Sequence, residues 1–155
     1  MQSPNALAEL HTRLWGNCLD GTEQVLWQRP LPTVNAIGFL ALHLVDTRHF
    51  TLDLLGAPAP NPFAALLADA RSMSDLREHP EATALRPAWA AVSERLAERL
   101  SELGPDDFAR PVARSFPIAD PTLAGALSFL LSHEAYHLGQ MALLRRAFGL
   151  AAMRY

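Results

Sequence analysis

The segment His133-Glu134-Ala135-Tyr136-His137 matches the H-E-x-x-H pattern, in which two histidines hold a metal ion. It lies in a long apolar periodic run that predicts a helix. The two imidazoles then lie roughly 40° apart around the helix axis and one turn apart along it, so both can reach one ion. Polar rings on a mostly apolar stripe cost free energy unless something pairs them, and a metal would do so. The spacing therefore predicts metal ligands at His133 and His137.

The same pattern occurs in zinc peptidases, where the glutamate acts as general base and a third ligand follows downstream. The 18 residues after His137 contain no His, Glu or Asp. No stretch alternates like a strand over more than four residues, so no sheet edge is expected to hold a peptide. Glu134 lies about 100° around the helix from His133. We interpret it as a surface or inter-helix salt-bridge residue, and the peptidase with Glu134 as base remains the less favoured alternative.

The third ligand is expected upstream, at His43. This histidine falls in the middle of the apolar face of segment 34–55, so it should point into the protein interior. Three neutral imidazoles leave at least one coordination position open. That is the ligand count of a catalytic zinc rather than of a closed structural one. The sequence thus predicts an open site formed by His43, His133 and His137.

The other histidines are expected to lie outside this site. His49 shares a helix face with Asp46 and Asp53, which predicts a solvated, charge-paired position. His11 is a reserve ligand at best, and His79 lies in a predicted loop, where it should be exposed.

Four long helices are expected to position the ligands, and they cover about 4–20, 34–55, 82–103 and 121–148. A short helix over 62–72 is also expected. Asp120 is the predicted N-cap of the last long helix, and Pro87 suggests that the third begins at Arg86 instead. The pattern predicts an all-α fold, a four-helix bundle with long connections between the second and third helices and between the third and fourth.

Composition limits the remaining possibilities. The chain has 155 residues, half of them hydrophobic, which fits a single domain over 1–155. The net charge of −3 gives no general attraction to nucleic acid, and no run approaches the ~18 apolar residues of a membrane span. The first residues do not read as a signal peptide. Cys18 is the only cysteine, predicted to be packed and inert, which agrees with a reducing cytoplasm.

The chain resembles the DinB-like (DinB/YfiT-type) superfamily over nearly its full length. The resemblance rests on "ALHLVDTRHFTLDLLG", "AWAAVSERLAERLSEL" and "GALSFLLSHEAYHLGQMALLRRAFGL". The family pattern is one histidine in the middle of the second helix, then H-x-x-x-H-x-G-Q on the fourth. His43, His133, His137, Gly139 and Gln140 match it. The resemblance implies an up-down-down-up bundle, a three-histidine metal site and a homodimer. We expect Gly139 to allow close helix packing and Gln140 to be a structural hydrogen-bond donor.

The resemblance also implies a function. Members include metal-dependent transferases that activate a low-molecular-weight thiol such as bacillithiol, mycothiol or glutathione for attack on an electrophile. Zinc or nickel is the expected divalent ion, and a small thiol and an electrophile are the expected partners, with no nucleic acid or membrane. Two alternatives remain open: a metal-binding stress-response protein without turnover, and a metal-dependent hydrolase.

Overall fold

The computed structural model describes residues 4–68, 70 and 72–154, and within these ranges the chain is helical without a strand. The long helices are α1 (Pro4–Leu19), α2 (Ile37–Leu54), α4 (Ala82–Ser101) and α6 (Leu123–Ala147). Shorter turns of helix are α3 (Ala64–Leu67), the 3-10 helix η1 (Met73–Asp75) and α5 (Pro105–Ala109). The expected all-α class is confirmed.

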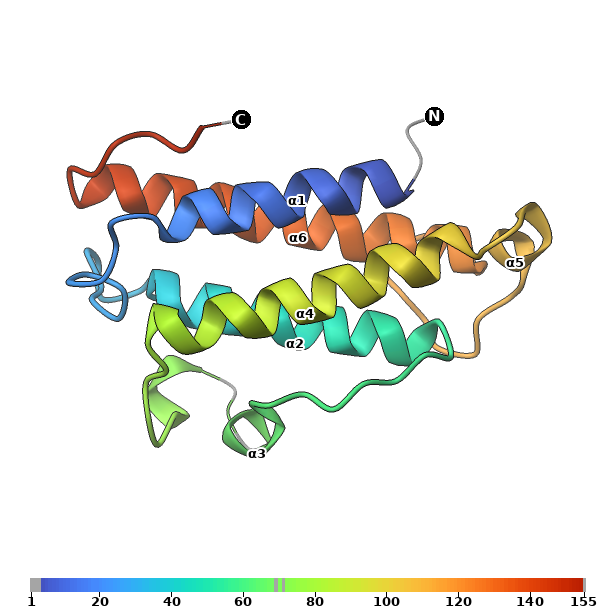
Figure 1. The fold of residues 1–155 in the computed structure, drawn as a ribbon, viewed down its shortest axis with the longest axis horizontal. Coiled ribbons are helices and arrows are strands. Elements are labelled where there is room, and N and C mark those ends of the chain that lie inside the picture. Colours follow the sequence, from blue (N-terminus) through green and yellow to red (C-terminus); the bar gives the residue numbers. More distant parts are fainter. Residues whose placement is uncertain (1–3, 69, 71, 155) are drawn as a thin grey trace.

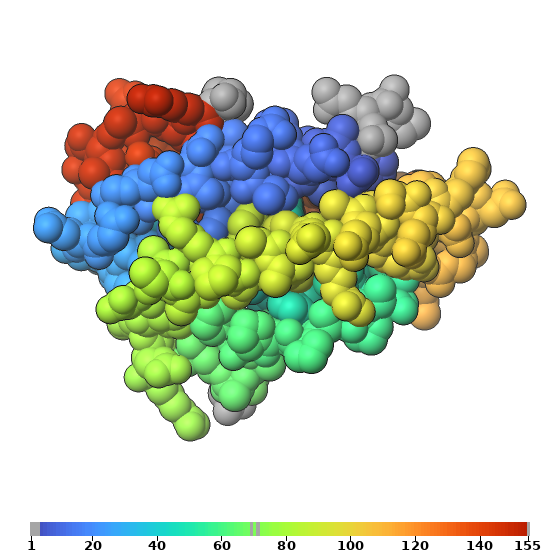
Figure 2. Space-filling model, viewed as in Figure 1, coloured from blue at the N-terminus to red at the C-terminus, as the bar shows by residue number. Residues whose placement is uncertain are grey.

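The four long helices lie side by side, and each packs against two others: α2 against α4 and α6, and α1 against α4 and α6. Figure 1 shows α1 and α6 running in one direction across the view and α2 and α4 in the other. The connection that carries α3 joins α2 to α4, and the connection that carries α5 joins α4 to α6. Figure 2 shows that the side chains of α1 and α4 meet along this face. No helix among the described residues is long and apolar enough to cross a bilayer.

Apolar side chains from all four long helices form one core. Trp15 of α1 stacks on Trp89 of α4, with ring centroids 4.8 Å apart. Cys18 lies in this core with no exposed surface, and burial raises the pKa of its thiol to about 12. The reactive form of a cysteine is the thiolate, so burial and the raised pKa agree with the packed, unreactive Cys18 that the sequence predicts.

A buried ion pair crosses the core between α2 and α6. Arg48 Nε donates to Glu134 Oε1 at 2.9 Å and Arg48 Nη2 donates to Glu134 Oε2 at 3.1 Å. His11 Nδ1 of α1 donates to the same carboxylate at 3.0 Å. On the α4 side, the guanidinium lies 3.8 Å from the Trp89 ring centroid, and Nη1 donates to Ser93 Oγ at 2.6 Å. One polar cluster therefore ties all four long helices together.

The charge of Glu134 is held by this cluster. Burial by itself would raise the pKa of the carboxyl, but the Arg48 guanidinium and the hydrogen bonds from His11 and Arg48 outweigh it, and the pKa is lowered. Glu134 is 2% exposed and Arg48 is fully buried. The expected inter-helix salt bridge is therefore confirmed, while the expectation that Glu134 could lie at the surface is wrong.

Several helix boundaries differ from expectation. The helix α4 begins at Ala82, as the expected range 82–103 gave it, so the alternative start at Arg86 is wrong. The helix continues through Pro87, which costs one backbone hydrogen bond but does not end it. The cap of α6 is Thr122, whose side chain accepts from Gly125 N, whereas Asp120 accepts from Thr122. Backbone hydrogen bonds from Val112 N to Pro121 O (3.0 Å) and from Leu123 N to Arg110 O (2.8 Å) hold residues 121–122 extended, so α6 cannot begin earlier.

The short helices also differ from expectation. Of the helix expected over 62–72 only α3 forms, and residues 69 and 71 lie outside the described residues. The helix α5 was not expected.

The buried ion pair leads to a stability prediction. Arg48→Met should lower the free energy of unfolding by about 3–5 kcal/mol, because it leaves the Glu134 carboxylate buried with one partner fewer. Urea unfolding followed by circular dichroism measures the change.

The matched control is Arg86→Met. Arg86 pairs with Asp20 at 2.8 Å across side chains that are 38% and 67% exposed, so its loss should cost at most about 1 kcal/mol. Equal losses in the two variants would contradict the assignment of the core pair.

Candidate metal centre

The three predicted ligands meet between α2 and α6. His43 extends from the middle of α2, and His133 and His137 extend from successive turns of α6. The Nε2 atoms of His43 and His133 are 3.3 Å apart, and those of His137 and His133 are 3.1 Å apart. One ligating nitrogen from each ring lies within 4.8 Å of the others. The structure thus brings the three histidines into one half-buried cluster.

The spacing of the nitrogens fits a metal ion. Zinc–imidazole bonds of about 2.0–2.1 Å in a tetrahedral site place two ligand nitrogens about 3.3 Å apart. The observed separations of 3.1 and 3.3 Å agree with that edge length. A divalent ion such as zinc or nickel accepts imidazole nitrogens as ligands. The donor set could therefore hold a metal ion.

Gln140 fixes the orientation of one ligand. Its Oε1 lies 2.7 Å from His137 Nδ1, so Nδ1 carries the proton and donates it to the amide oxygen. The lone pair of His137 then resides on Nε2, which faces His133. A hydrogen bond to the outer ring nitrogen is the usual support of a metal-ligating histidine. Gln140 thus acts as an acceptor here, whereas the sequence suggested that it donates.

Burial keeps the cluster in the form that binds metal. Burial, together with the charges of His137 and His133, lowers the pKa of His43 to about 4. Burial also lowers the pKa of His133, helped by His137. A lowered pKa favours the neutral imidazole, which is the ligating form. His43 and His133 are therefore neutral at pH 7.

Glu134 cannot serve this cluster as a base in the observed arrangement. Both of its oxygens accept hydrogen bonds inside the core, from Arg48 and His11, on a different side of α6 from the imidazoles. Glu134 thus faces the core between the helices, because successive residues of a helix are rotated by about 100°. In this chain the H-E-x-x-H motif therefore contains two candidate metal ligands, His133 and His137, and a glutamate with a structural role.

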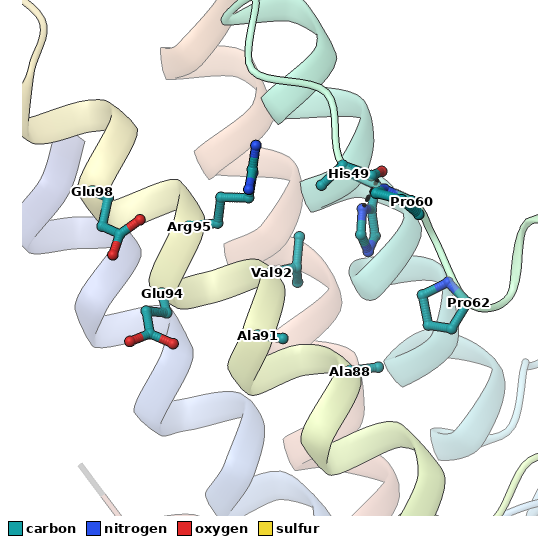
Figure 3. Close-up of a pocket in the computed structure, with 10 residues that line it drawn as sticks. His49, Pro60, Pro62, Ala88, Ala91, Val92, Glu94, Arg95 and Glu98 are labelled. Atoms are coloured by element: carbon teal, nitrogen blue, oxygen red, sulfur yellow. Dashed lines mark hydrogen bonds between the residues drawn. The ribbon is translucent and has the colours of Figure 1, made fainter.

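The other histidines lie outside the cluster. His11 is part of the Arg48–Glu134 ion-pair cluster. His79 is exposed, as expected, and its ring stacks on Trp27 with centroids 4.5 Å apart. His49 lies about half-buried beside a separate cavity of about 470 Å³ between α4 and the chain after α2, where its Nδ1 donates to Ala59 O at 3.1 Å (Figure 3). The face of His49 is less solvated than expected, because that chain segment covers part of the ring.

Sequence reasoning missed the aromatic surroundings of the cluster. A cavity of about 380 Å³ borders His43 and His133, and its lining includes Phe50, Phe116 and Phe129. Phe129 precedes His133 by four residues, so helical spacing could have indicated it. Phe116 lies in the connection before α6, where no periodic pattern places a side chain.

The reason expected for Gly139 is also wrong. A Cβ built on Gly139 would meet no atom within 4 Å, so close packing does not require glycine there. Close packing instead requires glycine at Gly38, where a Cβ would lie 2.6 Å from Trp27 Cε2, and at Gly125, where it would collide with the Asp120 carbonyl.

Comparison with known proteins agrees with the geometry. A sequence model of the DinB superfamily matches residues 4–141. No curated protein matches the chain. The match spans all four long helices except the last turns of α6, and it includes the three clustered histidines. The chain belongs to the DinB superfamily.

Proposed function

We propose that the chain binds one divalent metal ion, zinc or nickel, through His43, His133 and His137, and that it is a transferase for a low-molecular-weight thiol. The observation that carries the proposal is the convergence of three Nε2 atoms at 3.1 and 3.3 Å, with His137 held by Gln140. An ion with three imidazole ligands supplies an open coordination position and lowers the pKa of a thiol bound there. Membership of the DinB superfamily supports the choice of a thiol of the bacillithiol, mycothiol or glutathione type.

The protein's own residues have three roles in this proposal. The imidazoles of His43 and His133 stay neutral because burial lowers their pKa, so they are ready to ligate at neutral pH. Gln140 orients His137. The cavity beside His43 and His133, which has an aromatic wall, accepts the electrophile. No carboxylate base is assigned, which separates this function from peptide hydrolysis.

We also propose that α1, α2, α4 and α6 form the up-down-down-up four-helix bundle implied by the family, and that the chain acts as a cytoplasmic homodimer. The pairwise packing of the long helices and their directions in Figure 1 support the bundle. The homodimer and the cytoplasmic location rest on the family resemblance and on the single buried cysteine.

Metal content tests the ligand assignment. Alanine substitution of His43, His133 or His137 should each reduce bound zinc or nickel well below the one ion per chain expected of the wild type, because two imidazoles rarely retain a divalent ion. Elemental analysis of purified protein measures it. Acid should release the ion as well, because protonated imidazole cannot ligate.

His49→Ala and His79→Ala are the matched controls, and both should keep a full metal load. Full metal retention in His43→Ala would remove the three-histidine assignment and favour a site that uses α6 alone.

Thiol transfer and peptide hydrolysis respond differently to Glu134→Gln. The substitution should lower stability, because it removes the charge that pairs with Arg48. Below the unfolding temperature, metal content and metal-dependent thiol consumption with a model electrophile should change by less than about 10-fold. If Glu134 were a general base, the rate would fall by about 10²-fold or more.

A fully metal-loaded protein that consumes none of the three thiols with an electrophile would contradict the transferase and favour a metal-binding protein without turnover. Peptide cleavage that is lost in Glu134→Gln would favour the hydrolase.

A further inference from the structure

The cavity beside the histidines has an aromatic wall. Ring centroids of Phe50 and Phe116 are 6.4 Å apart, those of Phe116 and Phe129 are 5.7 Å apart, and those of Phe129 and His133 are 6.2 Å apart. The four rings thus form a continuous series that ends at a proposed metal ligand. Phe50, Phe116 and Phe129 are each only half-buried, so part of each ring borders the cavity. Such a wall favours a flat, apolar ligand group.

The same cavity contains one cation. The guanidinium carbon of Arg114 lies 4.6 Å from the centroid of the Phe50 ring, and the side chain is exposed. None of the ion pairs among the described residues includes Arg114. The one acidic residue in the lining, Asp46, accepts instead from Asn61 Nδ2 at 2.8 Å. A guanidinium that rests on an aromatic face without an acidic partner is well suited to bind a carboxylate.

The volume of the cavity limits the size of the ligand that it can hold. A cavity of about 380 Å³ is at the small end of ligand sites, which suits one ring with a short side chain rather than a large cofactor. The aromatic series lies between Arg114, beside Phe50, and His133, beside Phe129. A molecule with an acid group at one end and a ring or conjugated chain at the other can contact both ends of the cavity.

We propose that this cavity binds small aromatic or conjugated carboxylates, with the carboxylate on Arg114 and the flat group against Phe116 and Phe129. Arg114 is then the residue that selects an acidic electrophile. The role of the ligand as electrophile rests on the proposed thiol transfer, whereas the binding itself rests only on the cavity.

Binding of cinnamate and of cinnamamide, its neutral isostere, to the zinc-loaded protein tests the proposal by calorimetry. Wild type should bind cinnamate roughly 10-fold or more tightly than cinnamamide, as expected of a charge-assisted hydrogen bond. Arg114→Gln should reduce this preference to about 2-fold or less. Phe129→Ala should weaken both ligands, because it removes part of the wall that they share.

Arg146→Gln is the matched control, because Arg146 is also exposed but lies near the end of α6 and outside the lining of this cavity. It should leave both affinities unchanged. A cinnamate preference that survives Arg114→Gln would show that the carboxylate contacts the zinc ion rather than Arg114, and would overturn the proposal. No binding of either ligand would overturn it as well.

The outcome is separable from that of the proposed function. Cinnamate binding that depends on Arg114, in a protein that consumes no thiol, supports the cavity assignment and contradicts only the transferase. Thiol transfer to a neutral electrophile, without Arg114-dependent binding of cinnamate, supports the transferase and contradicts only the selection of acids.

Discussion

The buried pair between Arg48 and Glu134, with its hydrogen-bond partners His11 and Ser93, contains residues of all four long helices. Arg48 lies five residues after His43 on α2, and Glu134 directly follows His133 on α6, so one ion pair fixes the two helices that carry the ligands. Hydrogen bonds from His11 and to Ser93 attach α1 and α4 to the same pair. A buried ion pair adds little net stability compared with an apolar pair, but a mispaired charge is costly. It therefore disfavours any sliding of α2 along α6 that would separate His43 from His133.

One short segment thus serves two functions through helix geometry. Residues four apart face the same way, so His133 and His137 both meet His43 between α2 and α6, while Glu134 is turned by about 100° into the core. In a zinc peptidase the glutamate of the same motif acts as the general base. The partner on the neighbouring helix decides whether the glutamate is structural or catalytic. Here the fully buried Arg48 donates hydrogen bonds to both carboxylate oxygens of Glu134.

Helical periodicity was enough to predict the long helices and the pairing of His133 with His137, because both depend on local spacing. For His43 it indicated only a side chain that faces the interior, and the family resemblance supported the link to the other two histidines. Periodicity could not predict Arg48 as the partner of Glu134, since a charge in an apolar run reads as exposed until its counter-charge on another helix is known. Nor could it place Arg114 and Phe116, which lie in an irregular connection whose path is set by tertiary contacts. The start of α6 was misplaced for the same reason: backbone hydrogen bonds to residues 110 and 112 hold residues 121–122 outside the helix.

Whether three Nε2 atoms form one metal site is tested by ¹H–¹⁵N correlation spectra of the histidine side chains during zinc titration. We expect His43, His133 and His137 all to shift at Nε2, with saturation at one equivalent of zinc. His137 Nδ1 should keep its proton, donated to Gln140 Oε1. Shifts at Nδ1 of these rings, or at His11 or His49 instead, would contradict this assignment.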